Sequence, residues 1–257
     1  MVVTDFRRKL DRYILREPVL FGEVETGQET LRRMASVERY NSWIHSRISP
    51  FLGERLLEVG CGLGNMTGYL LNRELVVAVD RLPESVSRVR DLFDHSPNLQ
   101  AVEGDICDRR VVAGLLPYSL DTAVCINVLE HIENDALALR MMSRAVGNGG
   151  RVVVLAPAGA FLYGSLDIGL GHYRRYDLHD LVRKMEFAGC RVKMAFHMNV
   201  AGVPGWLLNS RILKRRLLPT DMLAVFNLLV PVFDRVERLV KPSVGLSVVV
   251  VGEVASV

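Results

Sequence analysis

The stretch Leu57-Glu58-Val59-Gly60-Cys61-Gly62-Leu63-Gly64 decides the fold of this chain. The apolar run over residues 55–59 is typical of a buried strand, and the glycines after it allow a tight turn without a Cβ clash. A helix predicted over 66–72 would point its N-terminal amides at a ligand held by the turn. Strand, turn and helix together indicate an open α/β sheet with a ligand site at the carboxyl ends of its strands.

Downstream of the turn, short apolar runs alternate with amphipathic stretches of helical spacing. This alternation predicts a parallel sheet whose strands are joined by right-handed crossovers. We therefore predict an α/β fold with a Rossmann-like, mostly parallel sheet of seven strands and helices on both faces. The predicted strands are 55–59, 75–79, 99–103, 122–126, 151–155, 191–197 and 246–251, and the predicted helices are 66–72, 83–93, 135–146 and 178–188.

The composition is that of an ordinary globular protein, with 49% hydrophobic and 24% charged residues. A net charge of +3 is too small to indicate nucleic acid as the main partner, so none is expected. No apolar run reaches the roughly 20 residues of a membrane span, and the basic residues 7–9 are not followed by the apolar core of a signal peptide. None of the four cysteines forms a Cys-x-x-Cys pair, which favours reduced thiols and a cytoplasmic location.

Two helical regions accompany the predicted strands. Residues 1–50 are expected to form an N-terminal helical cap, or lid, on a domain covering 51–257. A helical insertion at about 198–245 precedes the last strand and carries the basic run 214–216. Its apolar stripe favours core packing or a contact between two copies of the chain, and the alternatives are a lid over an apolar acceptor and a peripheral membrane contact. The stripe consists of Val232, Val236, Leu239 and Val240.

Two acids follow the strands beside the turn. Asp80 ends the second strand, where it can accept hydrogen bonds from ribose hydroxyls, and Asp105 follows the third. A dinucleotide site uses a similar pattern, but Asn65 stands here in place of its third glycine. Glu58, inside the first strand, would repel a pyrophosphate but could organise the loop around a cationic amino-acid ligand. These residues favour S-adenosylmethionine over a nicotinamide dinucleotide, and a turn without a ligand is the remaining alternative.

The same segments resemble the motifs of the class I S-adenosylmethionine-dependent methyltransferases. The matching segments, in motif order, are 57–64, 77–80, 104–106, 127–132 and 149–154. The resemblance implies that the turn holds the methionine moiety, that Asp80 binds the ribose and that Arg81 and Asp105 meet the adenine. It also implies that Tyr40 covers the cofactor, although Tyr40 and Trp43 could instead pack the first helix onto the sheet. The implied cofactor residues are Tyr40, Glu58, Gly60, Cys61, Gly62, Gly64, Asp80, Arg81, Asp105, Ile106 and Asn127.

Two histidines are candidates for catalysis. Methyl transfer is an in-line displacement that needs alignment and a dry site, and an oxygen or nitrogen acceptor also needs a base. Histidine suits this role because its pKa lies near neutrality. His131 follows the fourth strand and His172 follows the fifth, so both are expected where the acceptor approaches. The alternative for His131 is that it only caps or packs.

The stretch Gly171-His172-Tyr173-Arg174-Arg175-Tyr176 is the candidate acceptor site. Arginine binds carboxylate or phosphate with two hydrogen bonds, and tyrosine adds stacking area. Tyr173, Arg174, Arg175 and Tyr176 would thus hold an anionic or sugar-like acceptor, and the alternative is that the arginines only fix the loop through ion pairs. The stretch also resembles a bacterial subgroup that occurs alongside glycan-assembly proteins, which implies a sugar or lipid-linked acceptor.

A metal site is not expected from the sequence. Some quinone-pathway methyltransferases carry Glu-x-x-Glu-His near a metal, but the first position here is Asn127, so only Glu130 and His131 match. The predicted function is therefore metal-independent O-methylation of a small-molecule or glycan/lipid-linked acceptor with S-adenosylmethionine. The alternatives are N-methylation and a module that binds the cofactor without catalysis. A nicotinamide oxidoreductase is disfavoured because no Tyr-x-x-x-Lys pair follows the fourth strand.

Overall fold

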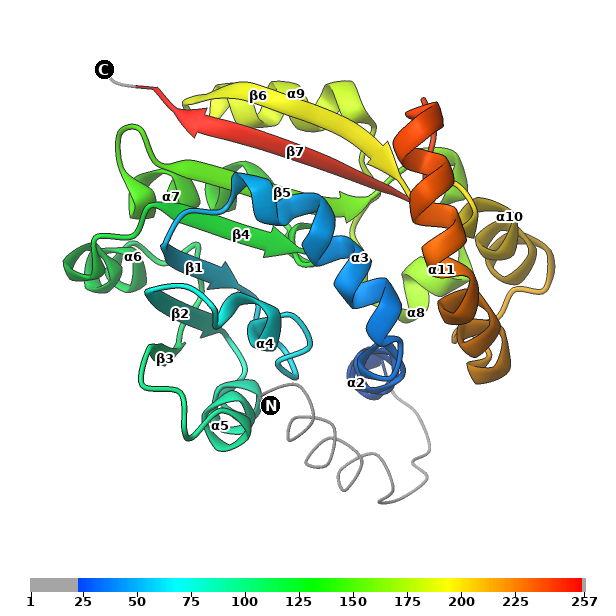
Figure 1. Ribbon diagram of the computed structural model, residues 1–257, viewed down its shortest axis with the longest axis horizontal. Coiled ribbons are helices and arrows are strands. Elements are labelled where there is room, and N and C mark those ends of the chain that lie inside the picture. Colours follow the sequence, from blue (N-terminus) through cyan, green and yellow to red (C-terminus); the bar gives the residue numbers. More distant parts are fainter. Residues whose placement is uncertain (1–22, 256–257) are drawn as a thin grey trace.

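The computed structural model describes residues 23–255, and part of the predicted N-terminal cap lies outside them. Within these residues, seven strands form one sheet in the order β3-β2-β1-β4-β5-β7-β6 (Figure 1). Strand β7 runs antiparallel to both of its neighbours, and the other paired strands are parallel. The predicted seven-stranded, mostly parallel sheet is confirmed. The strands are β1 Arg55–Val59, β2 Leu75–Asp80, β3 Leu99–Glu103, β4 Thr122–Ile126, β5 Arg151–Pro157, β6 Cys190–Met198 and β7 Ser247–Val254.

Helices cover both faces of the sheet, as predicted (Figure 1). Side chains alternate along each strand, so Val77 and Val79 face one layer while Val76 and Ala78 face the other. Both sets are buried, which explains why β2 is apolar without interruption as far as Asp80. The first layer contains α6 Arg109–Leu115, α7 Asp135–Val146 and α9 Leu178–Phe187, and the second contains α3 Glu38–Ile48, α4 Thr67–Leu70, α5 Pro83–Leu92 and α11 Thr220–Val240.

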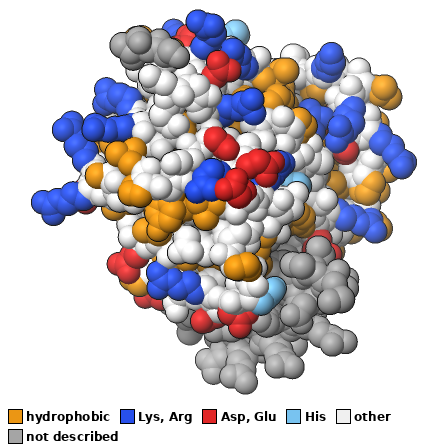
Figure 2. Space-filling view, turned by 60° about the vertical axis from the view of Figure 1, so that its left-hand side comes forward, with side chains coloured by type: hydrophobic (Ala, Val, Ile, Leu, Met, Phe, Trp, Pro, Cys, Tyr) orange, Lys and Arg blue, Asp and Glu red, His pale blue; other side chains and the backbone are white. Residues whose placement is uncertain are grey.

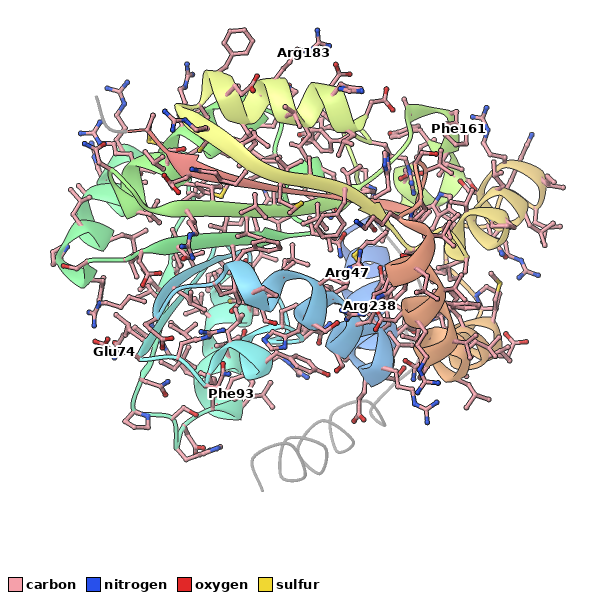
Figure 3. All side chains as sticks on the ribbon, turned by 45° about the horizontal axis from the view of Figure 1, so that its top comes forward. Arg47, Glu74, Phe93, Phe161, Arg183 and Arg238 are labelled. Atoms are coloured by element: carbon pink, nitrogen blue, oxygen red, sulfur yellow. The ribbon has the colours of Figure 1, made fainter. Side chains whose placement is uncertain are left out.

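Helix α3 belongs to the core of the domain. Trp43, Ile44 and Ile48 are buried against the sheet, and the helix packs along α11. Arg47 and Arg238 lie at this contact (Figure 3), where both are near the carboxylate of Asp234, at 3.9 and 3.0 Å. The division of the chain at residue 50 stays a prediction, but α3 has the position of a layer helix rather than of a lid.

The insertion before β7 contains α10 Gly202–Leu207, the π-helix η5 Leu208–Ile212 and α11. Glu237 of α11 accepts hydrogen bonds from the amides of Asn199 at 3.0 Å and Val200 at 2.7 Å, which ties the helix to the end of β6. The predicted stripe does not pack in the core, because its four side chains are 48–85% exposed. Val230 is buried instead, because the sheet and α3 select a different face of α11.

Several element bounds differ from the sequence-based ones. The helix predicted over 66–72 is only the short α4, and β5 extends two residues beyond the predicted strand. Helix α6 and the short α8, Ser165–Gly169, were not predicted. Among the described residues, no helix combines the length and apolarity needed to cross a bilayer.

Candidate active site

The glycine-rich turn has a backbone that few other residues would adopt. Gly60, Gly62 and Gly64 have φ values of +75°, +51° and +82°. A Cβ atom on Gly60 would lie 2.4 Å from a methyl group of Val128, so this glycine lets the loop after β4 approach the end of β1. The amides of Gly60 and Cys61 donate to the carbonyl of Val79 at 2.7 and 3.2 Å, which closes the turn onto β2.

Asp80 holds the turn from the neighbouring strand. One carboxylate oxygen accepts from the Gly62 amide at 2.8 Å and the other accepts from the Leu82 amide at 2.9 Å. Asp80 is 8% exposed, so its carboxylate is fixed at the edge of the sheet by backbone donors. An acid held in this way is oriented before any ligand arrives.

Glu58 lies behind the turn and is buried. Its carboxylate accepts a hydrogen bond from the Thr67 hydroxyl at 2.7 Å, which connects β1 to the start of α4. Burial raises the pKa of Glu58 to about 8, and the nearby charge of Asp80 adds to this effect. Glu58 therefore supports the turn from inside the fold.

The other predicted cofactor residues lie along the same edge. Because β3, β2, β1 and β4 are adjacent and parallel, Asp105, Asp80, Gly60 and Asn127 follow one another at their carboxyl ends. Asp105 is exposed and accepts from the Cys107 amide at 2.8 Å. Asn127 has a φ of +52°, and its amide donates to Leu155 at 2.8 Å. Next to these residues, Arg81 is exposed and Ile106 is buried.

Tyr40 is buried among side chains of its own helix and of α11. It is 7% exposed, it contacts Trp43 and Phe226 edge-on, and its hydroxyl bonds with Asn199 and Ser247. These contacts are those of the packing alternative, and the predicted contact of Tyr40 with the cofactor stays a prediction. Tyr40 lies on the same face of α3 as Trp43, and its ring packs against Phe226 of α11.

Helix α2, Glu23–Ala35, occupies the place predicted for the lid. The Asn65 side chain donates to the carbonyl of Leu31 at 2.9 Å. The Leu31 side chain would lie 3.5 Å from a Cβ on Gly62, and it is 38% exposed. Sequence reasoning missed this contact because nothing in the local pattern of residues 23–35 points to the turn.

The loops after β4 and β5 bring three potential ligands or bases together. Glu130 and His131 lie on the short helix η3, Leu129–His131, and their donor atoms and one of His172 all lie within 4.8 Å of one another. The two imidazole rings are 4.7 Å apart and nearly perpendicular. The Tyr173 amide donates to the Glu130 carbonyl at 2.9 Å, which fixes one loop to the other.

His172 is oriented by a buried acid that the sequence did not indicate. Its Nδ1 lies 3.0 Å from a carboxylate oxygen of Asp167, which is fully buried on α8. The same oxygen accepts from Arg175 Nε at 2.7 Å. Burial opposes ionisation, but the hydrogen bond from His172 and the charge of Arg175 hold the pKa of Asp167 below its ordinary value. Asp167 thus directs Nε2 of His172 toward Glu130, 4.0 Å away.

Burial also perturbs the other two members of the cluster. It raises the pKa of Glu130 to about 7, against the opposing charges of His172 and Arg175. It lowers the pKa of His131 to about 4, and the charges of His172 and Arg81 lower it further. Near neutral pH, His131 is therefore an uncharged ring with an available lone pair.

The candidate acceptor loop divides into one exposed residue and three structural ones. Tyr173 is 55% exposed. Arg174 donates to the carbonyls of Ile132 and Glu133, both at 2.8 Å, and its guanidinium lies over the Tyr173 ring. These bonds are those of the alternative in which the arginine fixes the loop, and the predicted contact of Arg174 with an acceptor stays a prediction.

Arg175 and Tyr176 are buried and fully engaged. Besides Asp167, Arg175 donates to the Ala158 carbonyl at 2.9 Å. The Tyr176 hydroxyl donates to Asp135 at 2.9 Å, and the residue is 2% exposed. Burial and these bonds favour a structural role for both residues, and their predicted acceptor contacts stay predictions. Of the four predicted acceptor residues, Tyr173 is the most exposed and is the one that we propose to contact the acceptor.

Comparisons with known proteins agree with this architecture. Residues 57–154 match the family described as "Methyltransferase domain". Ribosomal RNA small subunit methyltransferase A of Geobacter sulfurreducens is 30% identical over 141 residues, covering 49% of this chain and 50% of that protein. Ubiquinone biosynthesis O-methyltransferase of Paracidovorax citrulli is 28% identical over 165 residues, covering 58% and 66%. The chain spans about half the length of the curated relatives it matches.

Solved structures show the same fold. N-methyltransferase NodS from Bradyrhizobium japonicum, in complex with S-adenosyl-L-homocysteine, has a TM-score of 0.58 at 13% identity and covers 98% of this chain and 100% of that one. The [4+2]-cyclase SpnF has a TM-score of 0.55 at 16% identity, covering 86% and 82%. The fold is that of a class I methyltransferase domain. Residues 57–154 match the methyltransferase-domain family, and this match agrees with the predicted family and with S-adenosylmethionine as its cofactor.

Proposed function

We propose that the chain transfers the methyl group of S-adenosylmethionine to a hydroxyl oxygen of a small-molecule or glycan/lipid-linked acceptor. The observation that carries this proposal is the loop after β4. Its first residue, Asn127, lies at the cofactor edge beside Gly60, and Glu130 and His131, three and four residues later, belong to the cluster with His172. One short segment therefore connects a cofactor edge with a group of proton acceptors.

The cofactor edge has suitable partners for each part of S-adenosylmethionine. Asp80 would accept from the ribose hydroxyls, and Asp105 with the amide of Ile106 would meet the adenine. The Asn127 amide already donates to Leu155, so its carbonyl is the backbone group left to accept from the ammonium of the methionine moiety. Glycines in the turn let the backbone approach the ligand closely.

When no metal ion is bound, His172 is the residue that we propose as the base. Asp167 accepts from Nδ1, so Nε2 is the ring atom that can take a proton from an acceptor hydroxyl. His131, 4.7 Å away, would orient the acceptor as an uncharged ring. The methyl carbon would pass in line from sulfur to oxygen, leaving S-adenosylhomocysteine as the product.

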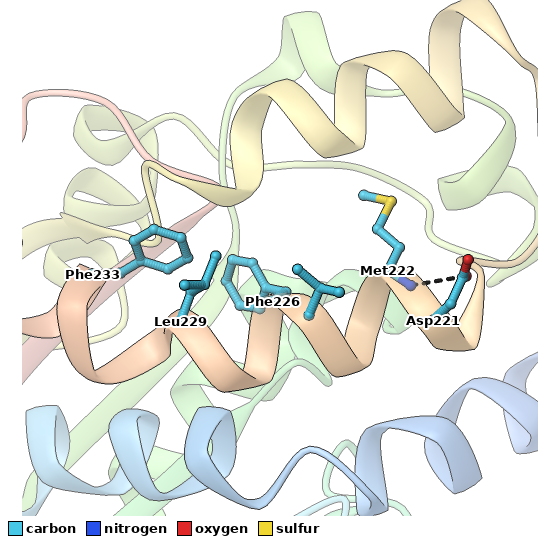
Figure 4. A pocket seen from close by; sticks show the side chains of 6 residues that line it. Asp221, Met222, Phe226, Leu229 and Phe233 are labelled. Atoms are coloured by element: carbon cyan, nitrogen blue, oxygen red, sulfur yellow. Dashed lines mark hydrogen bonds between the residues drawn. The ribbon is translucent and has the colours of Figure 1, made fainter.

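Exposed apolar side chains support a lipid-linked acceptor. Phe161 of the short helix η4, Ala160–Leu162, is 60% exposed, and Ile212 of η5 is 71% exposed. The basic run 214–216 is exposed directly after η5. On α11 lies a mostly apolar hollow (Figure 4), whose lining consists of Asp221, Met222, Val225, Phe226, Leu229 and Phe233. Apolar side chains beside basic ones favour contact with a membrane surface, which is our proposal for this region, and a second copy of the chain is the alternative occupant.

Three other functions remain as alternatives. N-methylation would use the same site, and NodS, which shares the fold, is an N-methyltransferase by name. SpnF is a cyclase by name, so the fold alone does not establish methyl transfer. Ribosomal RNA is the acceptor in the names of several relatives. On the face shown in Figure 2, however, basic side chains are dispersed with acidic ones among them rather than gathered in a single patch. The cytoplasmic location stays a prediction.

Calorimetry with S-adenosylhomocysteine tests the cofactor proposal. We expect wild-type binding and a loss of at least about tenfold in Asp80→Ala, because a charged acceptor for the ribose is removed. Glu74→Ala is the matched control, since Glu74 precedes the same strand at the opposite edge of the sheet and pairs there with Arg55 (Figure 3). An absence of binding to the wild type would contradict the proposal.

Methyl incorporation tests the acceptor. The purified chain, incubated with labelled S-adenosylmethionine, is offered three separate substrates: lipid-linked glycans in vesicles, an extract of small metabolites, and total RNA. We expect incorporation into the glycan or metabolite fraction, in an alkali-stable ether. Label in RNA alone would contradict the proposed acceptor and identify RNA as the substrate. Label on nitrogen would favour N-methylation.

A further inference from the structure

We propose that Glu130, His131 and His172 bind a divalent transition-metal ion of the zinc class at the mouth of the active site. Their donor atoms, two imidazole nitrogens and one carboxylate oxygen, lie within 4.8 Å of one another. Two histidines and one glutamate form an established ligand set of catalytic zinc sites, which keep a further position open for water or substrate. The sequence showed only two of the ligands, because His172 comes from a loop 41 residues beyond His131.

One carboxylate oxygen of this cluster is buried and unsatisfied. Glu130 is 1% exposed, and among the described residues its Oε2 has no hydrogen-bond partner. An unpaired buried carboxylate oxygen is costly, and such an atom in a folded protein calls for an explanation. A bound cation would supply the missing partner, and the acid would then be ionised as a ligand.

The surroundings of His172 are those of a metal ligand. Asp167 accepts from its Nδ1 at 3.0 Å and is itself held by Arg175 at 2.7 Å and by the Gly164 amide at 3.0 Å. A carboxylate on the far nitrogen fixes the tautomer and the ring orientation of a ligating histidine. The free nitrogen, Nε2, faces Glu130 at 4.0 Å.

The spacing fits a site that contracts slightly on binding. Ligand atoms about 2.0–2.1 Å from a tetrahedral ion are about 3.3 Å from one another. The 4.0 Å between His172 Nε2 and Glu130 Oε1 closes to that value by a shift of less than 1 Å, and a pair at the cluster's limit of 4.8 Å closes by about 1.5 Å. Imidazole ligands favour zinc and its transition-metal neighbours, whereas magnesium and calcium prefer oxygen ligands alone. We therefore choose zinc as the probe.

The metal site is proposed from its ligands alone. Only the role of the ion in the reaction rests on the proposed function. An acceptor hydroxyl at the open position would lose its proton to water more readily, because a bound cation lowers the pKa of a coordinated oxygen. The O–CH3 bond forms as the S–CH3 bond breaks, and the bonding pair leaves on sulfur. In the loaded site His172 is a ligand, so the ion replaces it as the means of ionising the acceptor.

Zinc titration of the tag-free, chelator-treated full chain tests the proposal. Calorimetry is expected to show one zinc per chain. Glu130→Gln, His131→Ala and His172→Ala should each weaken binding at least about tenfold, and Asp167→Asn by about 10–100-fold. His95→Ala is the control, because His95 is half-exposed, with Asp94 as its ion-pair partner, and its loss should leave zinc binding unchanged. Binding of S-adenosylhomocysteine by each variant reports whether it is folded.

Two results would overturn the proposal: no stoichiometric zinc in the wild type, or equal zinc binding in the wild type and all three ligand variants. A wild-type chain that binds S-adenosylhomocysteine but not zinc refutes the metal site and leaves the methyltransferase proposal intact. A chain that binds zinc through these ligands but not S-adenosylhomocysteine supports the metal site and contradicts the proposed function. Cobalt substitution gives a second readout, since its visible absorption should change when Glu130 is replaced by Gln.

Discussion

The two halves of this site are built in different ways. The cofactor edge consists of residues 60–64 with Asp80, and the acceptor side consists of Glu130, His131 and His172. At the cofactor edge, a turn of consecutive residues, 60–64, adopts a backbone that its glycines permit, and the acid Asp80 clamps it through amides. On the acceptor side, Glu130 and His172 come from separate loops, and His172 is held by Asp167, which forms a buried ion pair with Arg175. The comparison shows that backbone conformation determines one half of the site, whereas long-range side-chain contacts determine the other.

The largest expected effect is on the acceptor side. Asp167→Asn would leave Arg175 buried without its counter-charge, which costs about 3–5 kcal/mol of unfolding free energy. Asp180→Asn, which removes the partner of Arg183 on the surface (Figure 3), should cost at most about 1 kcal/mol. Urea unfolding measures both. If the two variants lost equal stability, the acceptor side would not depend on its buried ion pair.

The next effect is on the cofactor edge. Gly60→Ala would place a Cβ 2.4 Å from Val128 at a φ of +75°, at a cost of about 2–3 kcal/mol and a loss of S-adenosylhomocysteine affinity. Gly114→Ala in α6 meets no atom within 4 Å, so it should be neutral or stabilising. Thermal unfolding with calorimetry separates the two variants. Full affinity in Gly60→Ala would show that the turn tolerates a side chain.

The raised pKa of Glu58, the buried acid behind the turn, predicts that the unfolding free energy depends on pH. The pKa of Glu58 is near 4.5 in the unfolded chain and about 8 in the fold, so between these values the native state binds more protons. Its contribution to stability is therefore complete below about pH 4.5 and is lost as the pH rises toward 8, by at most about 1.4 kcal/mol per pH unit. Glu58→Gln should flatten the curve of unfolding free energy against pH. Glu130 contributes with the same sign, so a residual slope is expected.

A smaller effect distinguishes packing from cofactor contact at Tyr40. Tyr40→Phe removes hydrogen bonds with Asn199 and Ser247 and should cost about 1 kcal/mol of stability. The affinity for S-adenosylhomocysteine should stay unchanged, because the buried hydroxyl bonds with residues at the end of β6 and the start of β7. A marked loss of affinity without a loss of stability would restore Tyr40 to the cofactor site.

The smallest effect on stability is expected at the exposed ring of the acceptor loop. Tyr173→Ala should change the unfolding free energy by less than about 0.5 kcal/mol and leave cofactor affinity intact, yet raise the KM for the acceptor. Phe187→Ala, an exposed aromatic at the end of α9, should leave that KM unchanged. Equal KM values in the two variants would remove Tyr173 from the acceptor site.

Prediction from sequence succeeded where the decisive forces are local. The bounds of β1, β3 and β4 match the predicted ones, because charged or turn-forming residues interrupt each apolar run. It left several roles open for the stripe on α11, and the structure excludes only core packing, because which face of an amphipathic helix is buried depends on the surface that receives it. The same reason explains Arg174, whose sequence context resembles a ligand-binding loop while its guanidinium is consumed by backbone carbonyls.

The sequence by itself determined the glycine-rich turn, the acids at 80 and 105 and thereby the cofactor class. These features depend on the conformations that each residue permits and on the ends of neighbouring strands. Only the tertiary structure decided that α2 covers the turn, that Asp167 orients His172 and that His172 joins Glu130 and His131. Such contacts join residues distant in the chain, and their distances follow from the packing of whole elements, which no local pattern encodes.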